Sequence, residues 1–169
     1  MDQIQNNQIE DRKGEAMKAR TYLERIKKLD ANIDARIDEI ATLDAIATKT
    51  TSVMGGERVQ ASTSQQKMAD TVGKIVELKE KLNDEIDRFI DMRNEARNLI
   101  EKACDADCQK LLRMRYIGRF NEAKNRIEFA KWEQIAVEMG FTYQWVSDGL
   151  HQRALAQLQK VLDERGEEE

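Results

Sequence analysis

The amino-acid sequence predicts an all-α protein. It contains no proline and only eight glycines among its 169 residues, and 36% of the residues are charged whereas 5% are aromatic. These features favour long helices with a large exposed surface over β-sheet. Two apolar series with helical spacing and one bend motif refine the expectation to a long antiparallel helical hairpin, similar to a coiled coil, followed by a small trihelical helix-turn-helix domain.

The first region, residues 1–17, is polar. It lacks the apolar core of a secretory signal, and nowhere in the chain is there a run of the roughly 18 apolar residues that cross a bilayer. We therefore expect a cytoplasmic protein that makes no contact with a membrane.

Two apolar series predict the hairpin within residues 18–103. Basic residues interrupt them: Arg36 in the first, Lys79 and Arg93 in the second. We expect these side chains to lay their stems on the seam and keep their charges in water; alternatively, they pair with carboxylates and set the register. The first series is Tyr22, Ile26, Leu29, Ile33, Ile40, Leu43 and Ala47, and the second is Met68, Val72, Ile75, Leu82, Ile86, Phe89, Ala96 and Ile100.

Between the two series, residues of about 48–66 are predicted to form a flexible loop, because they are rich in Thr, Ser, Gly and Gln. Helices joined in this way fold back on each other most simply as an antiparallel pair. Two helices bury apolar surface only along the one face where they meet, and this small burial must offset the conformational entropy lost on folding. We therefore expect a homodimer through the hairpin, or docking to another protein, and no chemistry in this half.

The region at 104–162 differs from the rest in charge. Residues 106–162 contain 9 Lys and Arg against 6 Asp and Glu, whereas the tail at 163–169 contains 1 basic and 5 acidic residues. Cys104 and Cys108 would share one helix face, but no second pair of ligands accompanies them, so we expect reduced structural thiols, no metal and no cofactor. The basic segment also contains the bend motif.

That motif is WEQIAVEMGFTYQWV, residues 132–146. Two helices that cross closely need a small residue, here Ala136, and the turn needs a residue that tolerates positive φ, here Gly140. Thr142 is expected to cap the second helix. Leu111, Leu112, Arg115 and Tyr116 belong to a preceding helix, with Asp107 as its expected cap. The predicted residues of the motif core are Trp132, Ile135, Ala136, Met139, Gly140, Phe141, Val146 and Leu150.

In a helix-turn-helix the start of the second helix enters the major groove of DNA. Gln144 is the best candidate for a base contact, because its amide both donates to and accepts from adenine; Tyr143 and Ser147 are expected beside it. Packing inside the protein is the alternative for Trp145 and His151. The predicted contacts to the DNA backbone are Arg119, Lys124, Arg126, Lys131, Thr142, Trp145, His151 and Arg153.

Three runs of sequence, LLRMRYI, WEQIAVEMGFTYQWV and LHQRALAQLQKVL, resemble region 4 of sigma-70-type factors. They resemble more closely the phage-encoded late-gene regulators of the ArpU and RinA type, in which such a domain follows a helical hairpin. The resemblance covers residues 111–162. The connection at 118–131 is longer than in that group, which suggests an extra helical turn or a mobile loop. Val146 and Leu150 lie four apart instead of three, as if one residue were added near Gly149.

This resemblance implies a sequence-specific transcription regulator of phage or prophage origin that binds double-stranded DNA in a bacterial host cell, with host RNA polymerase as a further partner. One alternative is a DNA-packaging protein similar to a phage terminase small subunit, in which case a ring replaces the dimer. Another is a protein-binding module whose helix-turn-helix no longer binds DNA. Neither an enzyme nor a small-molecule substrate is expected, because the chain has one histidine and no glycine-rich phosphate loop.

Overall fold

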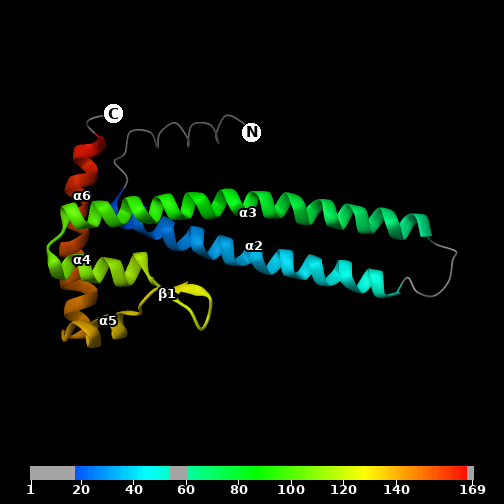
Figure 1. Cartoon of the computed structure of the whole chain (residues 1–169). Helices are drawn as coiled ribbons and strands as arrows, with labels where there is room; N and C mark the ends of the chain where they lie inside the picture. The colour runs from blue at the N-terminus through cyan, green and yellow to red at the C-terminus, as the bar shows by residue number, and fades with distance from the viewer. Residues whose placement is uncertain (1–17, 54–60, 167–169) are drawn as a thin grey trace, which may run out of the picture. The chain divides into compact units, whose positions relative to one another are not determined.

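The computed structural model describes residues 18–53 and 61–166. The described chain is almost entirely helical (Figure 1), which confirms the all-α class. Helices α2 (Ala19–Val53) and α3 (Ala61–Ala103) form the long hairpin, and shorter helices follow it. The chain divides into two compact units, one of which is Lys28–Met92, in the hairpin. The other combines the first turns of α2 with the chain from Arg93 onward.

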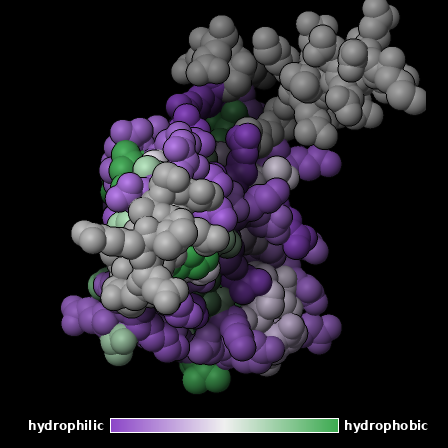
Figure 2. All heavy atoms as spheres, turned by 90° about the vertical axis from the view of Figure 1, so that its right-hand side faces the viewer, coloured by the Kyte–Doolittle hydropathy of each residue, from purple (hydrophilic) through white to green (hydrophobic). Residues whose placement is uncertain are grey.

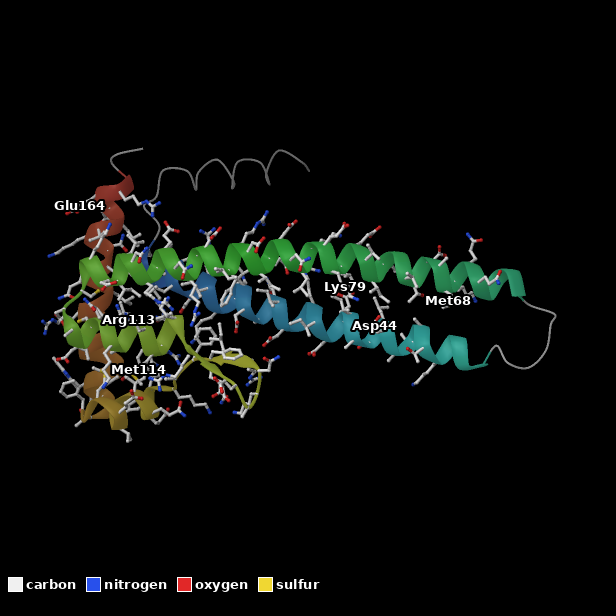
Figure 3. All side chains as sticks on the ribbon, viewed as in Figure 1. Asp44, Met68, Lys79, Arg113, Met114 and Glu164 are labelled. Atoms are coloured by element: carbon white, nitrogen blue, oxygen red, sulfur yellow. The ribbon has the colours of Figure 1, made fainter. Side chains whose placement is uncertain are left out.

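The unit Lys28–Met92 is held together by the predicted apolar seam. Its buried residues are Ile33, Ile40, Ile75 and Phe89. Arg36 lies within this seam, and its Nε donates a hydrogen bond to Glu85 Oε2 at 2.7 Å. The alternative of pairing with a carboxylate therefore applies to Arg36, whose side chain also remains 33% exposed. Lys79, which lies on α3 (Figure 3), is exposed as expected.

Part of the second apolar series remains outside the core of this unit. Val72 is 45% exposed, although its spacing predicted burial. Two helices bury only the stripe along which they meet, so a residue at the margin of that stripe stays in contact with water. In Figure 2 the apolar residues accordingly form small groups separated by hydrophilic ones. Other exposed apolar residues of this unit are Ile37, Ile46, Val76 and Ile90.

The connection between the hairpin helices is shorter than predicted. Because α2 continues to Val53 and α3 begins at Ala61, at most residues 54–60 remain between them, and these lie outside the described residues. Thr48, one of the threonines that suggested a loop, fits the helix by bonding one turn back, because its hydroxyl donates to the Asp44 carbonyl at 2.8 Å. Low helix propensity was overridden here, as tertiary context often overrides it.

The second unit brings both ends of the hairpin's base together with the carboxy-terminal helices. Leu23, Ile26, Ala96 and Ile100 are buried in its core. The Ala19 amide donates to Gln159 Oε1 at 2.7 Å. The compact unit that contains the bend motif therefore extends beyond residues 104–162. The last helix, α6 (His151–Gly166), also includes the first residues of the predicted acidic tail.

Helix α4 (Ala106–Leu112) begins at a different cap from the one predicted. The carboxylate of Asp105, not Asp107, accepts a hydrogen bond from the Cys108 amide at 3.1 Å. A π-helical turn, η2 (Arg113–Ile117), follows α4; Arg113 and Met114 at its start are labelled in Figure 3.

Arg93 ends the η2 turn, instead of being solvated as expected. Its Nε and Nη2 donate to the carbonyls of Ile117 and Gly118 at 2.9 and 3.1 Å. A charged fork thus satisfies two carbonyl groups at the end of a helix, where no further helical amide is present to bond them.

The longer connection at 118–131 is neither a helical turn nor a loop without regular structure. It contains a two-stranded antiparallel sheet of β1 (Arg119–Asn121) and β2 (Arg126–Glu128), with Phe120 opposite Ile127. Gly118 has φ of 68°, and a Cβ there would lie 2.6 Å from Cγ2 of Ile127. The strand pairing therefore depends on a glycine at this position.

Two glycine substitutions test this packing with opposite signs. Gly73 lies inside α3 with nothing within 4 Å of an added Cβ, so Gly73→Ala should raise the free energy of unfolding by up to about 1 kcal/mol. Gly118→Ala should lower it by about 1 to 2 kcal/mol through strain and overlap. Urea denaturation followed by circular dichroism measures both. A neutral Gly118→Ala would contradict the described strand packing.

Candidate nucleic-acid interface

The bend is made by the end of helix α5 (Trp132–Met139). Gly140 follows it in the left-handed conformation, with φ of 70° and ψ of 28°. The Phe141 amide donates to the Ala136 carbonyl at 3.0 Å, and the Gly140 amide to the Val137 carbonyl at 3.3 Å. These two bonds form a Schellman motif, which satisfies the last carbonyl groups of the helix and turns the chain. The sequence-based need for positive φ at Gly140 is confirmed.

The helix restarts at the predicted cap. Thr142 Oγ1 accepts a hydrogen bond from the Trp145 amide at 3.3 Å, and the Thr142 carbonyl accepts from the Val146 amide at 3.1 Å. From Tyr143 onward the chain is helical through the turn η3 (Trp145–Leu150) and α6. The hydroxyl oxygen of Thr142 thus caps the second helix, and the proton of the same hydroxyl can still be donated to a phosphate.

The small core beneath the bend agrees largely with the predicted set. Ile135, Ala136, Val146 and Leu150 are buried. Trp132 and Met139 are half-buried. Phe141 is 39% exposed, so the prediction that it belongs to the core is wrong. It directly follows the left-handed residue, where the chain leaves one helix before it enters the next.

The four-residue spacing between Val146 and Leu150 is accommodated by the π-helical turn η3. Within it the His151 amide donates to the Val146 carbonyl five residues earlier. A π turn holds one more residue than an α turn. Both apolar side chains therefore face the core, and α6 continues with Ala154 and Leu158 buried. π turns inside α-helices occur frequently at functional sites.

The predicted base contacts are brought together at the start of the second helix. We call Tyr143, Gln144, Trp145 and Ser147 the leading edge. Tyr143 is 50% and Trp145 48% exposed; Gln144 is exposed and Ser147 is half-buried. If residues 132–155 formed one continuous helix, or if the leading edge were buried in the protein, no such interface could exist. Neither is observed.

Positive charge is concentrated in the connection before α5 and is absent from the leading edge. Arg119, Lys124, Arg126 and Lys131 are exposed. Lys124 forms an ion pair with Glu128 at 2.5 Å, which lowers the pKa of that carboxyl. From Trp132 to Gln152 the sequence has no Lys or Arg and three carboxylates. These are Glu133, Glu138 and Asp148, all exposed.

Lys110 lies beside the turn and was absent from the predicted contacts. Its Nζ donates to the Glu138 carbonyl at 3.2 Å, near the end of α5. A cation is favourable at the carboxyl end of a helix. Because the side chain remains exposed, it also places positive charge next to the bend. Its position on the polar side of the preceding helix was the available signal in the sequence.

His151 is not an exposed DNA contact as predicted, because it is buried. Its Nε2 is 2.9 Å from the Tyr116 hydroxyl, and the Trp132 ring meets it edge-on with centroids 4.8 Å apart. Burial, with smaller effects of Arg20 and Arg115, lowers its pKa to about 4. The neutral imidazole therefore joins three helical segments: the turn η2, α5 and the first residue of α6.

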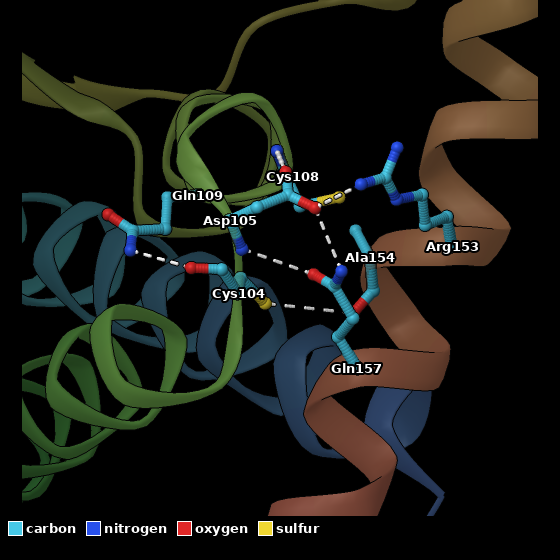
Figure 4. A network of polar contacts seen from close by, with 7 residues as sticks. All are labelled: Cys104, Asp105, Cys108, Gln109, Arg153, Ala154 and Gln157. Atoms are coloured by element: carbon cyan, nitrogen blue, oxygen red, sulfur yellow. Dashed lines mark hydrogen bonds and ion pairs between the residues drawn. The ribbon is translucent and has the colours of Figure 1, made fainter.

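Arg153, another predicted backbone contact, is already engaged within the protein. It donates to Asp105 Oδ2 at 2.6 Å, and Gln157 donates to the same oxygen at 2.8 Å (Figure 4). The hydrogen bonds from Gln157 and the Cys108 amide lower the pKa of Asp105 to about 2. One carboxylate thus caps α4 and ties it to α6.

Both cysteines are free and buried. Burial raises the pKa of Cys104 to about 11 and that of Cys108 to about 12, so neither is a reactive thiolate at neutral pH. The Cys104 thiol faces the Ala154 carbonyl at 3.8 Å (Figure 4). In the described part of the chain, no cluster of three His, Cys, Asp or Glu side chains is arranged to hold a metal ion. None of the described helices is long and apolar enough to span a membrane.

Comparison with known proteins gives a partial match to one family. Residues 48–131 match the family described as "Protein of unknown function (DUF1492)". The matched segment includes α3, α4 and the β-hairpin, and it ends at the residue before α5. No curated protein and no solved structure matches the chain. These results assign no activity, so a functional proposal depends on the geometry of the bend and the leading edge.

The burial of His151 predicts a specific pH dependence. Its pKa is lowered in the folded state, so the unfolded chain binds the additional proton first, and stability falls as the pH decreases from 6.5 towards about 4. Urea denaturation across this range should show the loss, and His151→Gln should remove this component. Since the chain has one histidine, its NMR titration tests the claim directly. A midpoint near 6.5 would contradict the described burial.

Proposed function

We propose that this protein is a sequence-specific, double-stranded DNA-binding transcription regulator of phage or prophage origin that acts through its helix-turn-helix. One observation supports this most: a Schellman turn at Gly140 leads into a capped helix whose first turn exposes Tyr143, Gln144 and Trp145. Projection of this part of the second helix is what entry into the major groove requires. The resemblance of the bend to sigma-70 region 4 supports the same proposal.

In this proposal affinity and sequence choice come from different residues. Lys110 next to the bend, with the exposed Arg119, Arg126 and Lys131 before α5, would contact phosphates. Gln144 would contact an adenine edge, because its amide matches the donor and acceptor of that base in the major groove. The carboxylates Glu133, Glu138 and Asp148 repel phosphate, so we expect few phosphate contacts and a shallow dependence of affinity on salt.

A second proposal is favoured by the same three carboxylates. A helix-turn-helix with no Lys or Arg between Trp132 and Gln152, and with Val137 84% exposed on α5, also fits a protein partner with a basic and apolar surface. The two proposals differ in their response to salt at low ionic strength. In the first proposal the further partners are host RNA polymerase and a second copy of the chain, bound through the hairpin.

The decisive experiment is to recover fragments of the source genome that the purified protein binds, followed by a salt titration. DNA binding predicts one enriched sequence and an affinity that falls as salt rises. If no salt-dependent DNA affinity exists at low ionic strength, DNA binding is excluded and the protein-binding proposal replaces it. Mass in solution then distinguishes a dimeric regulator from a ring-forming packaging protein.

Gln144→Ala tests the assignment of base contact. We expect it to weaken binding to the recovered sequence by about 1 to 3 kcal/mol, because a two-bond contact to adenine is lost, while binding to random DNA changes little. Gln66→Ala, an exposed glutamine of α3 in the other compact unit, is the matched control. Fluorescence anisotropy with specific and random duplexes measures both. Equal losses on the two duplexes would remove Gln144 from this role.

A further inference from the structure

Gly149 lies inside a helix, where glycine costs about 1 kcal/mol relative to alanine. The structure gives a reason for its presence. A Cβ at this position would lie 2.5 Å from both Cε3 and Cζ3 of Trp145 and 3.3 Å from Cδ2. The six-membered ring of the indole therefore lies directly on the helix backbone, in space that any larger residue at 149 would occupy.

The indole is thereby oriented without being buried. Trp145 is the first residue of the π-helical turn η3, Gly149 lies within that turn, and Trp145 as a whole remains 48% exposed on the leading edge. Its backbone amide is held by Thr142 at 3.3 Å. A ring that is already held in one orientation loses little conformational entropy when it contacts a ligand.

The chemistry of the leading edge restricts which bases it can recognise. Guanine is most often recognised by Arg or Lys at its O6 and N7 atoms, and neither residue occurs from Trp132 to Gln152. Besides Tyr143, the exposed groups of the leading edge are an amide that suits adenine, at Gln144, and the largely apolar indole of Trp145. Apolar side chains in the major groove contact the 5-methyl group of thymine. Both groups therefore select A·T pairs.

We propose that Trp145 is a specificity-determining residue that contacts thymine methyl groups. Gly149 is a positioning residue, because without a Cβ it lets the indole of Trp145 lie against the helix backbone. This inference rests on the proposed DNA-binding function and adds to it the class of base pair that is recognised. It also gives Gly149 a role in recognition, in addition to the place that the π turn has in the core.

Replacement of thymine by deoxyuridine in the recovered duplex removes only the methyl groups. The wild-type protein should bind about fourfold more weakly for each contacted methyl that is removed. Trp145→Ala should bind the thymine and deoxyuridine duplexes equally. Val137→Ala removes another exposed apolar side chain, on α5, and should keep the wild-type discrimination.

Gly149→Ala should lose the same discrimination although the indole is still present. Gly73→Ala, at a helix position with open space, is the matched control and should behave as wild type. Fluorine NMR of fluorotryptophan-labelled protein provides a readout without DNA. The Trp145 resonance, assigned with Trp145→Phe, should shift in Gly149→Ala and stay in place in Gly73→Ala.

The outcomes separate this inference from the proposed function. Specific binding that is indifferent to deoxyuridine overturns the inference and leaves the DNA-binding function standing. Discrimination that persists in Trp145→Ala also overturns it. Absence of sequence-specific DNA binding by the wild-type protein overturns both. An unchanged Trp145 resonance in Gly149→Ala overturns the positioning role alone.

Discussion

The left-handed turn at Gly140 is the constraint on which the candidate interface depends. Two hydrogen bonds close it, from Phe141 to Ala136 and from Gly140 to Val137, and they end α5 within one residue. Thr142 can then cap a new helix. Because a residue with a Cβ is strained at φ of 70°, glycine lets the chain change direction here with little conformational strain. The exposure of the leading edge follows from this turn.

Polar side chains hold the helices around the bend in place. Asp105 joins α4 to α6 through Arg153 and Gln157, and His151 joins the bend to Tyr116 of η2. Two residues that suggested DNA contact, His151 and Arg153, thus support the domain from within or beside its core. Positive charge available to a ligand is left at its flanks, and the leading edge is polar and aromatic. Recognition there would depend more on fit than on net charge.

Local signals in the sequence located the two long helices and the bend, although not the ends of every helix. The three-and-four spacing located α2 and α3, and Ala136, Gly140 and Thr142 each met one local demand of the turn. Two of the expectations that failed depend on contacts distant in the sequence. The pairing of Arg36 with Glu85, 49 residues away, and the burial of His151 against Tyr116, 35 residues away, have no local signature. The β-hairpin was not predicted for a different reason: its strands are too short to show a clear alternating pattern.

Amide NMR of the labelled protein, recorded as a duplex containing the recovered sequence is added, shows whether the leading edge contacts double-stranded DNA. If it does, the largest chemical-shift changes occur from Gly140 to Asp148, with smaller ones at Lys110, Lys131 and the β-hairpin. Changes confined to the hairpin helices α2 and α3, or no changes at all, would contradict this contact.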